Sequence, residues 1–311
     1  MSQARILPYD EHAIAEAARL IAAGRPVAMP TETVYGLAAD ATRGDAVAAI
    51  YAAKGRPSFN PLIVHVLDLA AADAIADLPA AARKLAEAFW PGPLTLVAPL
   101  NPGAPIAALA TAGLPTVALR SPAHPAMRDL LQALGRPLAA PSANASGTIS
   151  PTRAQHVARS LGTAIDLIVD AGPTAVGLES TIVSVSDGGL NLLRPGPITA
   201  EQLTDITGLS VSTDTSDTIT APGQLAQHYA PSKPVRLDAT EARPDEWLIG
   251  FGAIAGNASL SASGDTAEAA ARLFDLLHQA DATAAPRIAV APVPDTGLGV
   301  AINDRLRRAA A

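Results

Sequence analysis

The chain has 311 residues, and its 22 basic against 29 acidic side chains give a net charge of −7 at pH 7. This length predicts about two domains, with enough chain to bury a sizeable core. The acidic balance argues against a protein whose main task is to bind a nucleic-acid backbone, because such domains usually carry a basic excess. The absence of cysteine excludes disulfides, thiolate metal sites and cysteine nucleophiles, so we expect a cytoplasmic protein. The sequence contains no run of about 18 uncharged apolar residues, so we expect no membrane span.

The first two thirds of the chain alternate between helical and strand spacing, which predicts an α/β fold. Charged residues throughout positions 1–24 indicate a helix of the mature protein rather than a secretion signal. Further helices are predicted over 45–53, 79–89, 125–134, 150–161 and 199–206. Strands are predicted over 26–30, 61–67, 94–100, 116–119, 137–140, 166–169, 180–185 and 190–193. The last two strands flank Asp187-Gly188-Gly189, which is typical of a hairpin, so we expect a mixed sheet.

The composition changes after the helix over 199–206. Residues 209–220 are almost all Ser, Thr, Asp and Val, a composition typical of a linker. Beyond them, strands are predicted over 234–237, 247–250 and 288–290, with a helix that Asp265 caps and that ends at Gln279. We therefore expect a first domain of residues 1–207, a linker of residues 208–232 and a smaller α/β domain of residues 233–311.

Lysine is scarce, and one of the three lysines stands in an unusual setting. Lys54 and Arg56 flank a glycine at a predicted helix end, and the amide of Asn60 follows in the same Pro- and Gly-rich loop. Two cations and an amide donor at this spacing suit an anion with several oxygens, such as a polyphosphate. A helix C-cap explains Lys54 and the following glycine equally well, and the spacing alone favours neither interpretation.

Two other segments carry polar groups directly after predicted strands. Residues 31–37 supply two hydroxyls, a carboxylate and a phenol, and residues 139–147 supply small side chains that expose backbone N–H groups. The carboxyl ends of strands are where ligands gather in α/β sheets. An Ala- and Ser-rich loop with a helix N-cap is an equally good explanation of the second segment. No lysine follows a glycine, which excludes a Walker A loop, and the histidines lack metal-ligand spacing.

Seven motifs in this order together resemble one family. They are residues 30–37, Lys54-x-Arg56, Ser142-x-Asn144, Gly177-Leu178-Glu179-Ser180-Thr181, Leu193-Arg194-Pro195-Gly196, His228-Tyr229-Ala230-Pro231 and residues 297–306. The chain resembles the YrdC-like threonylcarbamoyl-AMP synthases, in the long form with an added C-terminal domain. The resemblance implies a mixed, twisted sheet flanked by helices, followed by a smaller Rossmann-like α/β domain.

The family's reaction is the activity that this resemblance implies. It is a nucleotidyl transfer that condenses L-threonine, bicarbonate and ATP to L-threonylcarbamoyladenylate and pyrophosphate, without a covalent enzyme intermediate. The product would pass to a separate tRNA threonylcarbamoyl-transferase complex that forms N6-threonylcarbamoyladenosine, so no stable nucleic-acid binding is expected. Mg²⁺ would arrive on the ATP phosphates without a protein ligand, and the linker would act as a lid over the site.

The same resemblance assigns site residues. It places Lys54 and Arg56 in catalysis. The implied threonine site consists of Thr33, His65, Arg120, Ala140 and Ser180. The implied ATP site consists of Arg56, Asn60, Thr116, Ser142, Asn144, Ser150, Arg194 and Tyr229.

Two other functions compete with this interpretation. A related fold could present a concave basic surface to duplex RNA, but the net charge and the lack of an aromatic and basic face argue against it. A carbamoyl-transferring maturation factor could share the core fold, but such factors carry cysteine-rich zinc modules, which a chain without cysteine cannot form.

Overall fold

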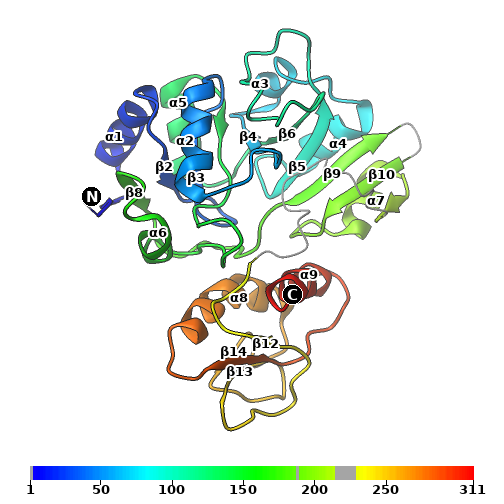
Figure 1. Cartoon of the computed structure of the whole chain (residues 1–311). Helices are drawn as coiled ribbons and strands as arrows, with labels where there is room; N and C mark the ends of the chain where they lie inside the picture. The colour runs from blue at the N-terminus through cyan, green and yellow to red at the C-terminus, as the bar shows by residue number, and fades with distance from the viewer. Residues whose placement is uncertain (1–2, 187–188, 214–228) are drawn as a thin grey trace.

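The structure is a computed structural model that describes residues 3–186, 189–213 and 229–311. These residues form a large unit followed by a smaller one, which Figure 1 shows below the first in yellow to red. The helices of the large unit are α1 (Glu11–Ala22), α2 (Gly44–Lys54), α3 (Leu69–Asp73), α4 (Ala80–Phe89), α5 (Pro125–Leu134), α6 (Ala154–Leu161) and α7 (Ala200–Thr207). Its strands are β1 (Arg5–Pro8), β2 (Val27–Met29), β3 (Gly36–Asp40), β4 (Ile63–His65), β5 (Leu94–Pro99), β6 (Thr116–Arg120), β7 (Leu138–Ala139), β8 (Leu167–Asp170), β9 (Thr181–Ser186), β10 (Gly189–Arg194) and β11 (Val211–Ser212).

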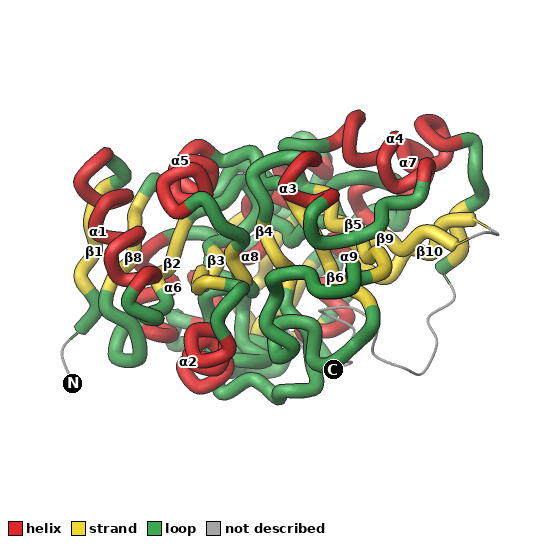
Figure 2. Tube along the Cα trace, turned by 90° about the horizontal axis from the view of Figure 1, so that it is seen from above, coloured by secondary structure: helices red, strands yellow, loops and turns green. Residues whose placement is uncertain are grey.

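The described strands of the large unit join in one sheet of order β1-β8-β2-β3-β7-β4-β6-β5-β9-β10-β11. The sheet contains parallel pairs, such as β4 with β6, and antiparallel pairs, such as β9 with β10, so the predicted mixed sheet is confirmed. Helices cover both faces: α1 and α5 pack on one face and α2 and α6 on the other (Figure 2). Much of this packing uses alanine, which lets the helices approach the sheet closely.

The smaller unit is a parallel four-stranded sheet of order β12-β15-β13-β14. Its elements are β12 (Val235–Arg236), β13 (Glu246–Gly250), β14 (Ala258–Ser259), α8 (Thr266–Asp281), β15 (Arg287–Val290) and α9 (Leu298–Ala309). The predicted second α/β fold is therefore confirmed. The boundaries of the predicted linker stay a prediction, because residues 214–228 lie outside the described part of the chain.

The structure corrects the sequence prediction in several places. Residues 5–8 form edge strand β1 rather than helix; the strand is short and mostly exposed, so it lacks a hydrophobic period. Strand β3 was not predicted because its sequence, GLAAD, has low strand propensity, although all five residues are buried. Helix α6 begins at Ala154 rather than at Ser150, whose side chain instead bonds to Glu179. Helix α9 was also missed.

The two units are docked through α8. Arg153 Nε donates to Asp275 Oδ1 at 2.8 Å, and the rings of His156 and His278 stack with centroids 3.8 Å apart. At Gly177, whose φ is +76°, a Cβ atom would lie 2.4 Å from the carbonyl oxygen of Ala270 in α8. The backbone at this position therefore touches α8 directly, and only glycine leaves room for it.

Replacing Gly177 with alanine should separate the two units or strain them. The added methyl overlaps α8, and the positive φ disfavours a side chain, so we expect a loss of about 1–3 kcal/mol in the free energy of unfolding. Urea denaturation measures this loss. Gly44→Ala is the matched control, because a Cβ there meets nothing within 4 Å and helix α2 tolerates alanine. Equal stability of the two variants would contradict the tight contact at Gly177.

The stacked histidines predict sensitivity to acid. Burial, reinforced by the charge of His156, lowers the pKa of His278 from its ordinary value near 6.5 to about 3. Below pH 6.5, His278 binds a proton in the unfolded chain but stays neutral in the folded one. The contribution of His278 to the free energy of unfolding is therefore fully present above pH 6.5 and is lost as the pH falls toward 3. Between pH 7.5 and 5.5 this loss is about 1.4 kcal/mol for His278.

Urea denaturation at pH 7.5 and at pH 5.5 measures how much the free energy of unfolding falls between these two values. We expect this fall to be about 1 kcal/mol smaller in His278→Gln than in the original chain. Asp275, Arg153 and Arg159 also face this pair and stay unchanged in the variant. His12→Gln, at an exposed position on α1, should retain the full pH dependence. A His278→Gln variant with that same full dependence would show that His278 does not titrate with folding.

Candidate active site

A cavity opens where the strand ends of the large unit meet the smaller unit. It is lined by Thr33, Val34, Arg56, Ile63, His65, Arg120, Ala140, Pro141, Ser142, Glu179, Ser180, Arg194 and Tyr229. Nine of these residues are among those that the sequence predicted for a site. They are Thr33, Arg56, His65, Arg120, Ala140, Ser142, Ser180, Arg194 and Tyr229.

The polar segments that stood out in the sequence lie side by side at this cavity. The N–H of Leu37 donates to Pro141 O at 2.7 Å, and the N–H of Ala143 donates to Tyr35 O at 2.8 Å. The N–H of Ser146 donates to Lys54 O at 2.8 Å, which ties the end of α2 to the same loop. Residues 31–37, 54–60 and 139–147 therefore form one connected wall.

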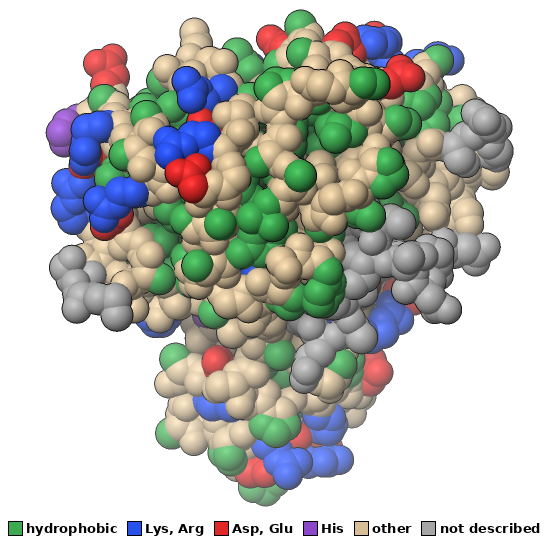
Figure 3. Space-filling view, turned by 45° about the horizontal axis from the view of Figure 1, so that its top comes forward, with side chains coloured by type: hydrophobic (Ala, Val, Ile, Leu, Met, Phe, Trp, Pro, Cys, Tyr) green, Lys and Arg blue, Asp and Glu red, His purple; other side chains and the backbone are tan. Residues whose placement is uncertain are grey.

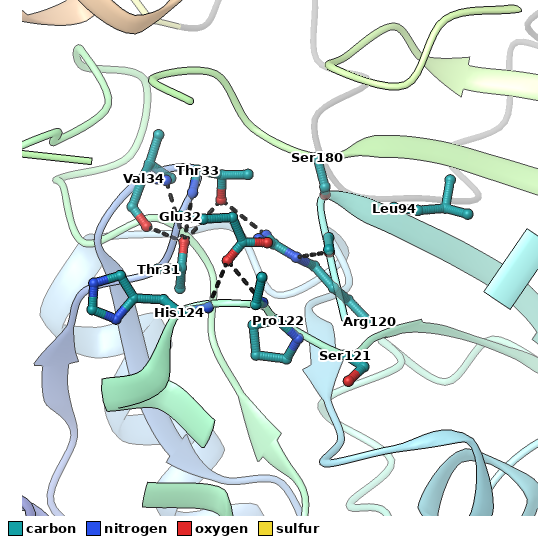
Figure 4. A network of polar contacts seen from close by, with 12 residues as sticks. Thr31, Glu32, Thr33, Val34, Leu94, Arg120, Ser121, Pro122, His124 and Ser180 are labelled. Carbon is teal, nitrogen blue, oxygen red and sulfur yellow. Dashed lines mark hydrogen bonds and ion pairs between the residues drawn. The ribbon is translucent and has the colours of Figure 1, made fainter. Parts of the chain in front are cut away.

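In the cavity wall, Arg120 is held in a fixed orientation (Figure 4). Its Nη1 donates to Thr33 Oγ1 at 3.0 Å, and its Nη2 donates to Glu32 Oε1 at 2.6 Å. The second Glu32 oxygen accepts from the backbone N–H groups of Ala123 and His124, just before α5. Burial opposes the charge on Glu32, but Arg120 outweighs it and holds the pKa of Glu32 below its ordinary value. Both side chains are thus charged, and a forked cation faces the cavity.

His65 lies beside Arg120 in the neighbouring strand. The side chain is 2% exposed, and its Nδ1 has no hydrogen-bond partner among the described residues. Burial, together with the charge of Arg120, lowers the pKa of His65 to about 3. The imidazole is therefore neutral at physiological pH, and its open nitrogen can hydrogen-bond to a ligand.

Two more guanidinium groups face the cavity with no carboxylate partner in the described residues. Arg56 donates to the carbonyls of Asn60 and Pro61 at 3.2 and 2.8 Å. Arg194 donates to Ser180 O from both Nε and Nη2, at 3.0 and 2.9 Å. Burial lowers the pKa of Arg56 to about 10 and also lowers that of Arg194. Cations that are held mainly by carbonyl groups keep their charge and so provide a site for an anion.

Lys54 supports the cavity from behind and is not part of its lining. Its Nζ donates to Ser142 O at 2.6 Å and also to Asn144 O, so it fixes the loop that carries Ser142. Burial and the nearby Arg56 charge lower the pKa of Lys54 well below its ordinary value. The helix C-cap is also present, because Gly55 follows in the left-handed conformation with φ +60°. The C-cap interpretation of Lys54 is therefore confirmed, and the binding of an anion by Lys54 stays a prediction.

Four other predicted residues stand outside the lining. Asn60 is buried, with an Oδ1 that has no partner in the described residues, and Asn144 Nδ2 donates to Thr148 O at 2.8 Å. Ser150 reaches the cavity only through its hydrogen bond to Glu179. Thr116 begins β6 and Arg120 ends it, about 13 Å away at ~3.3 Å per residue. The structure therefore does not bring Thr116 to the same end as Arg120.

Sequence reasoning gave no individual role to Glu32 or Glu179, although both stand in motifs. A carboxylate whose partner lies 88 or 126 residues away has no local pattern to reveal it. In the described residues, no group of three His, Asp or Glu side chains could hold a metal ion. Within the same ranges, every helix is too short or too polar to cross a bilayer.

Two family models together span most of the chain. The model described as "Telomere recombination" matches residues 19–196, and the model described as "Threonylcarbamoyl-AMP synthase, C-terminal domain" matches residues 198–311. The chain is also 42% identical to the threonylcarbamoyl-AMP synthase of Bacillus subtilis, over 98% of this chain and 94% of the relative. It is 40% identical to the enzyme of that name from Pyrococcus abyssi, over 96% and 94%.

The fold is similar to that of a solved relative. The crystal structure of P. abyssi Sua5 complexed with L-threonine superposes with a TM-score of 0.89 and 37% identity, covering all of this chain and 97% of the other. Two matching domains and near-complete overlap with named synthases lead to one conclusion: the chain belongs to the threonylcarbamoyl-AMP synthase family and is an enzyme of the nucleotidyltransferase type.

Proposed function

We propose that the protein condenses L-threonine, bicarbonate and ATP to L-threonylcarbamoyladenylate, with release of pyrophosphate. The observation that supports this most directly is that one cavity holds guanidinium groups in two different settings. Arg120, fixed by Glu32, suits a carboxylate, and the carbonyl-held Arg56 and Arg194 suit a polyphosphate.

Threonine would occupy the Arg120 end. Its carboxylate would face the Arg120 guanidinium, with the hydroxyls of Thr33 and Ser180 and the neutral His65 as further hydrogen-bonding groups. Ala140 is small enough to leave space for the threonine side chain. The structure of P. abyssi Sua5 complexed with L-threonine supports this choice of substrate.

ATP would occupy the end that Arg56, Ser142, Arg194 and Tyr229 line. The predicted residues outside the lining, Asn60, Thr116, Asn144 and Ser150, would meet the nucleotide or shape the loops around it. Mg²⁺ would come as part of the substrate, bound to the phosphates. Glu179, the carboxylate in the lining, already accepts a hydrogen bond on each oxygen, which leaves a resident metal ion little to bind.

In the reaction, the amine of threonine adds to the carbon of bicarbonate, and a carbamate forms as water is lost. Addition to carbon dioxide formed from bicarbonate gives the same carbamate, and the amine then releases a proton. One carbamate oxygen then attacks the α-phosphorus of ATP, and the bond from that phosphorus to the bridging oxygen breaks as pyrophosphate leaves. Arg56 and Arg194 stabilise the charge on the phosphates. Lys54 holds the 142–144 loop in place beside them. No side chain is covalently modified.

Carbamates and adenylates hydrolyse, so the cavity has to exclude water during the reaction. The predicted linker, residues 208–232, would act as a lid; Tyr229 at its end lines the cavity, and residues 214–228 lie outside the described part. The product would pass to a separate transferase complex that modifies tRNA in the cytoplasm. On the face that Figure 3 shows, basic and acidic side chains are interspersed, which suits an enzyme that does not itself hold tRNA.

Pyrophosphate release by the purified protein tests the proposed reaction. With ATP and bicarbonate we expect release that depends on L-threonine and that stops when bicarbonate is removed. Pyrophosphate release at the same rate with and without threonine would indicate a nucleotide hydrolase with another acceptor. RNA binding that weakens steeply with salt, in the absence of any release, would instead favour the RNA-binding alternative.

Two arginine variants should separate the ends of the cavity. Arg120→Gln removes the carboxylate partner, so we expect the KM for threonine to rise about tenfold or more, with the KM for ATP changed much less. Arg56→Gln should do the reverse. Steady-state kinetics with one substrate varied at a time measures both. Lys84→Gln, at an exposed position on α4, is the control. Parallel changes in both KM values in each variant would contradict the assignment of two ends.

A further inference from the structure

Arg305, in helix α9 of the smaller unit, reaches the cavity of the large unit. It belongs to the motif over residues 297–306, to which the proposed reaction gives no role. Its side chain is completely buried. The Nε atom donates to Glu179 Oε2 at 2.8 Å, and Nη1 donates to Asp304 Oδ2 at 2.5 Å. A residue of the smaller unit is therefore hydrogen-bonded to a carboxylate that lines the cavity.

Arg305 also contacts a second residue of the cavity lining. Its guanidinium carbon lies 5.2 Å from the centre of the Tyr229 ring, a cation–π contact. The same ring packs against Phe274 of α8, with centroids 5.6 Å apart. Arg305 thus sets the surroundings of both Glu179 and Tyr229, on the side where the nucleotide is proposed to bind.

The charges of the lining explain why this contact matters. The lining holds three cations, Arg56, Arg120 and Arg194, and Glu32 already pairs with Arg120. Glu179 is the acidic residue in the lining, and it is 6% exposed. Ser150 donates to its Oε1 and Arg305 to its Oε2. Both Glu179 oxygens are thus engaged, and among the residues that the structure describes Arg194 is hydrogen-bonded to Ser180 alone.

We propose that Arg305 is a positioning residue that keeps Glu179 engaged and thereby keeps Arg194 available to the phosphates of ATP. This inference rests on the proposed nucleotide end of the cavity. It gives the smaller unit a defined part in the reaction: it supplies the cation that balances an acidic residue at the site.

Loss of Arg305 would redirect Glu179. A buried carboxylate without a partner is strongly unfavourable, so it takes the nearest available cation. Arg194 and Glu179 both line the cavity, and Arg194 is hydrogen-bonded to Ser180, the residue that follows Glu179 in the chain. Burial opposes the charge on Glu179, but the nearby charges of Arg305 and Arg194 hold its pKa below the ordinary value. A Glu179–Arg194 ion pair would remove a cation from the polyphosphate end, and Tyr229 would lose its contact with Arg305.

Arg305→Gln tests this role, with Arg307→Gln as the matched control. Arg307 lies on the same helix, is 59% exposed, and pairs with Asp295 within the smaller unit. Calorimetric titration with ATP alone should show at least about tenfold weaker binding by Arg305→Gln and unchanged binding by Arg307→Gln. In kinetics, the KM for threonine should stay within about twofold. A folded Arg305→Gln variant with the ATP affinity of the original chain overturns the proposal.

A second variant distinguishes positioning from a merely structural role. In Glu179→Gln/Arg305→Gln no carboxylate remains to capture Arg194, so ATP affinity should recover to within a few-fold of that of Glu179→Gln alone. If Arg305 only stabilised the docked units, the double variant would bind ATP as weakly as Arg305→Gln, and the proposal would fail. The double variant and Arg305→Lys also serve if Arg305→Gln does not fold, because neither leaves Glu179 charged and unpaired; Arg305→Lys should bind ATP within about threefold of the original chain.

The titrations also separate this inference from the proposed function. If the original chain does not bind ATP at all, both are overturned. If it binds ATP, and Arg305→Gln binds it equally well, the proposed reaction stands and only the role of Arg305 is lost.

Discussion

Two guanidinium groups, those of buried Arg194 and half-buried Arg56, have no carboxylate partner in the described part of the chain, and they set the requirements for the rest of the cavity. Removing a cation from water costs several kcal/mol unless something replaces its hydration. Backbone carbonyls of Asn60, Pro61 and Ser180 supply that replacement here. Dipoles stabilise the charge without neutralising it, so the positive field remains for an incoming anion. A carboxylate in the same place would have stabilised the protein and abolished the site.

The loops around these cations follow from that need. The small residues of the 139–147 segment let its backbone carbonyl groups come close to a third buried cation, Lys54. Lys54 holds this segment from behind through Ser142 O and Asn144 O, a task that a shorter side chain could not perform. Burial of a lysine is costly, and here it satisfies two carbonyl groups of a loop that would otherwise lack hydrogen-bond donors.

Local sequence patterns predicted much of the fold but less of the site. Buried strands with branched residues, such as Ile63–His65, and helices with a clear apolar stripe, such as Pro125–Leu134, were predictable because their signals are local. Strand β3 was not, because burial between neighbouring strands overrides its alanine-rich propensity. Residue chemistry found the walls at 31–37, 54–60 and 139–147. Arg120, Ala140 and Ser180 came only from the family resemblance, and the engagement of Glu179 by Arg305 depends on docking between units, which no local pattern encodes.

The link between Glu179 and α9 also bears on how the cavity forms during synthesis. Translation delivers the chain from its N-terminus, so the whole sheet of the large unit is made before α9. Until α9 docks, Glu179 has no Arg305 and can keep its hydration only if the cavity stays open to water. The sheet of the large unit can thus form before the cavity has its final set of contacts. For the reaction proposed above, the site is complete only after the downstream unit has folded and docked, so a nascent or misfolded chain would not sequester ATP.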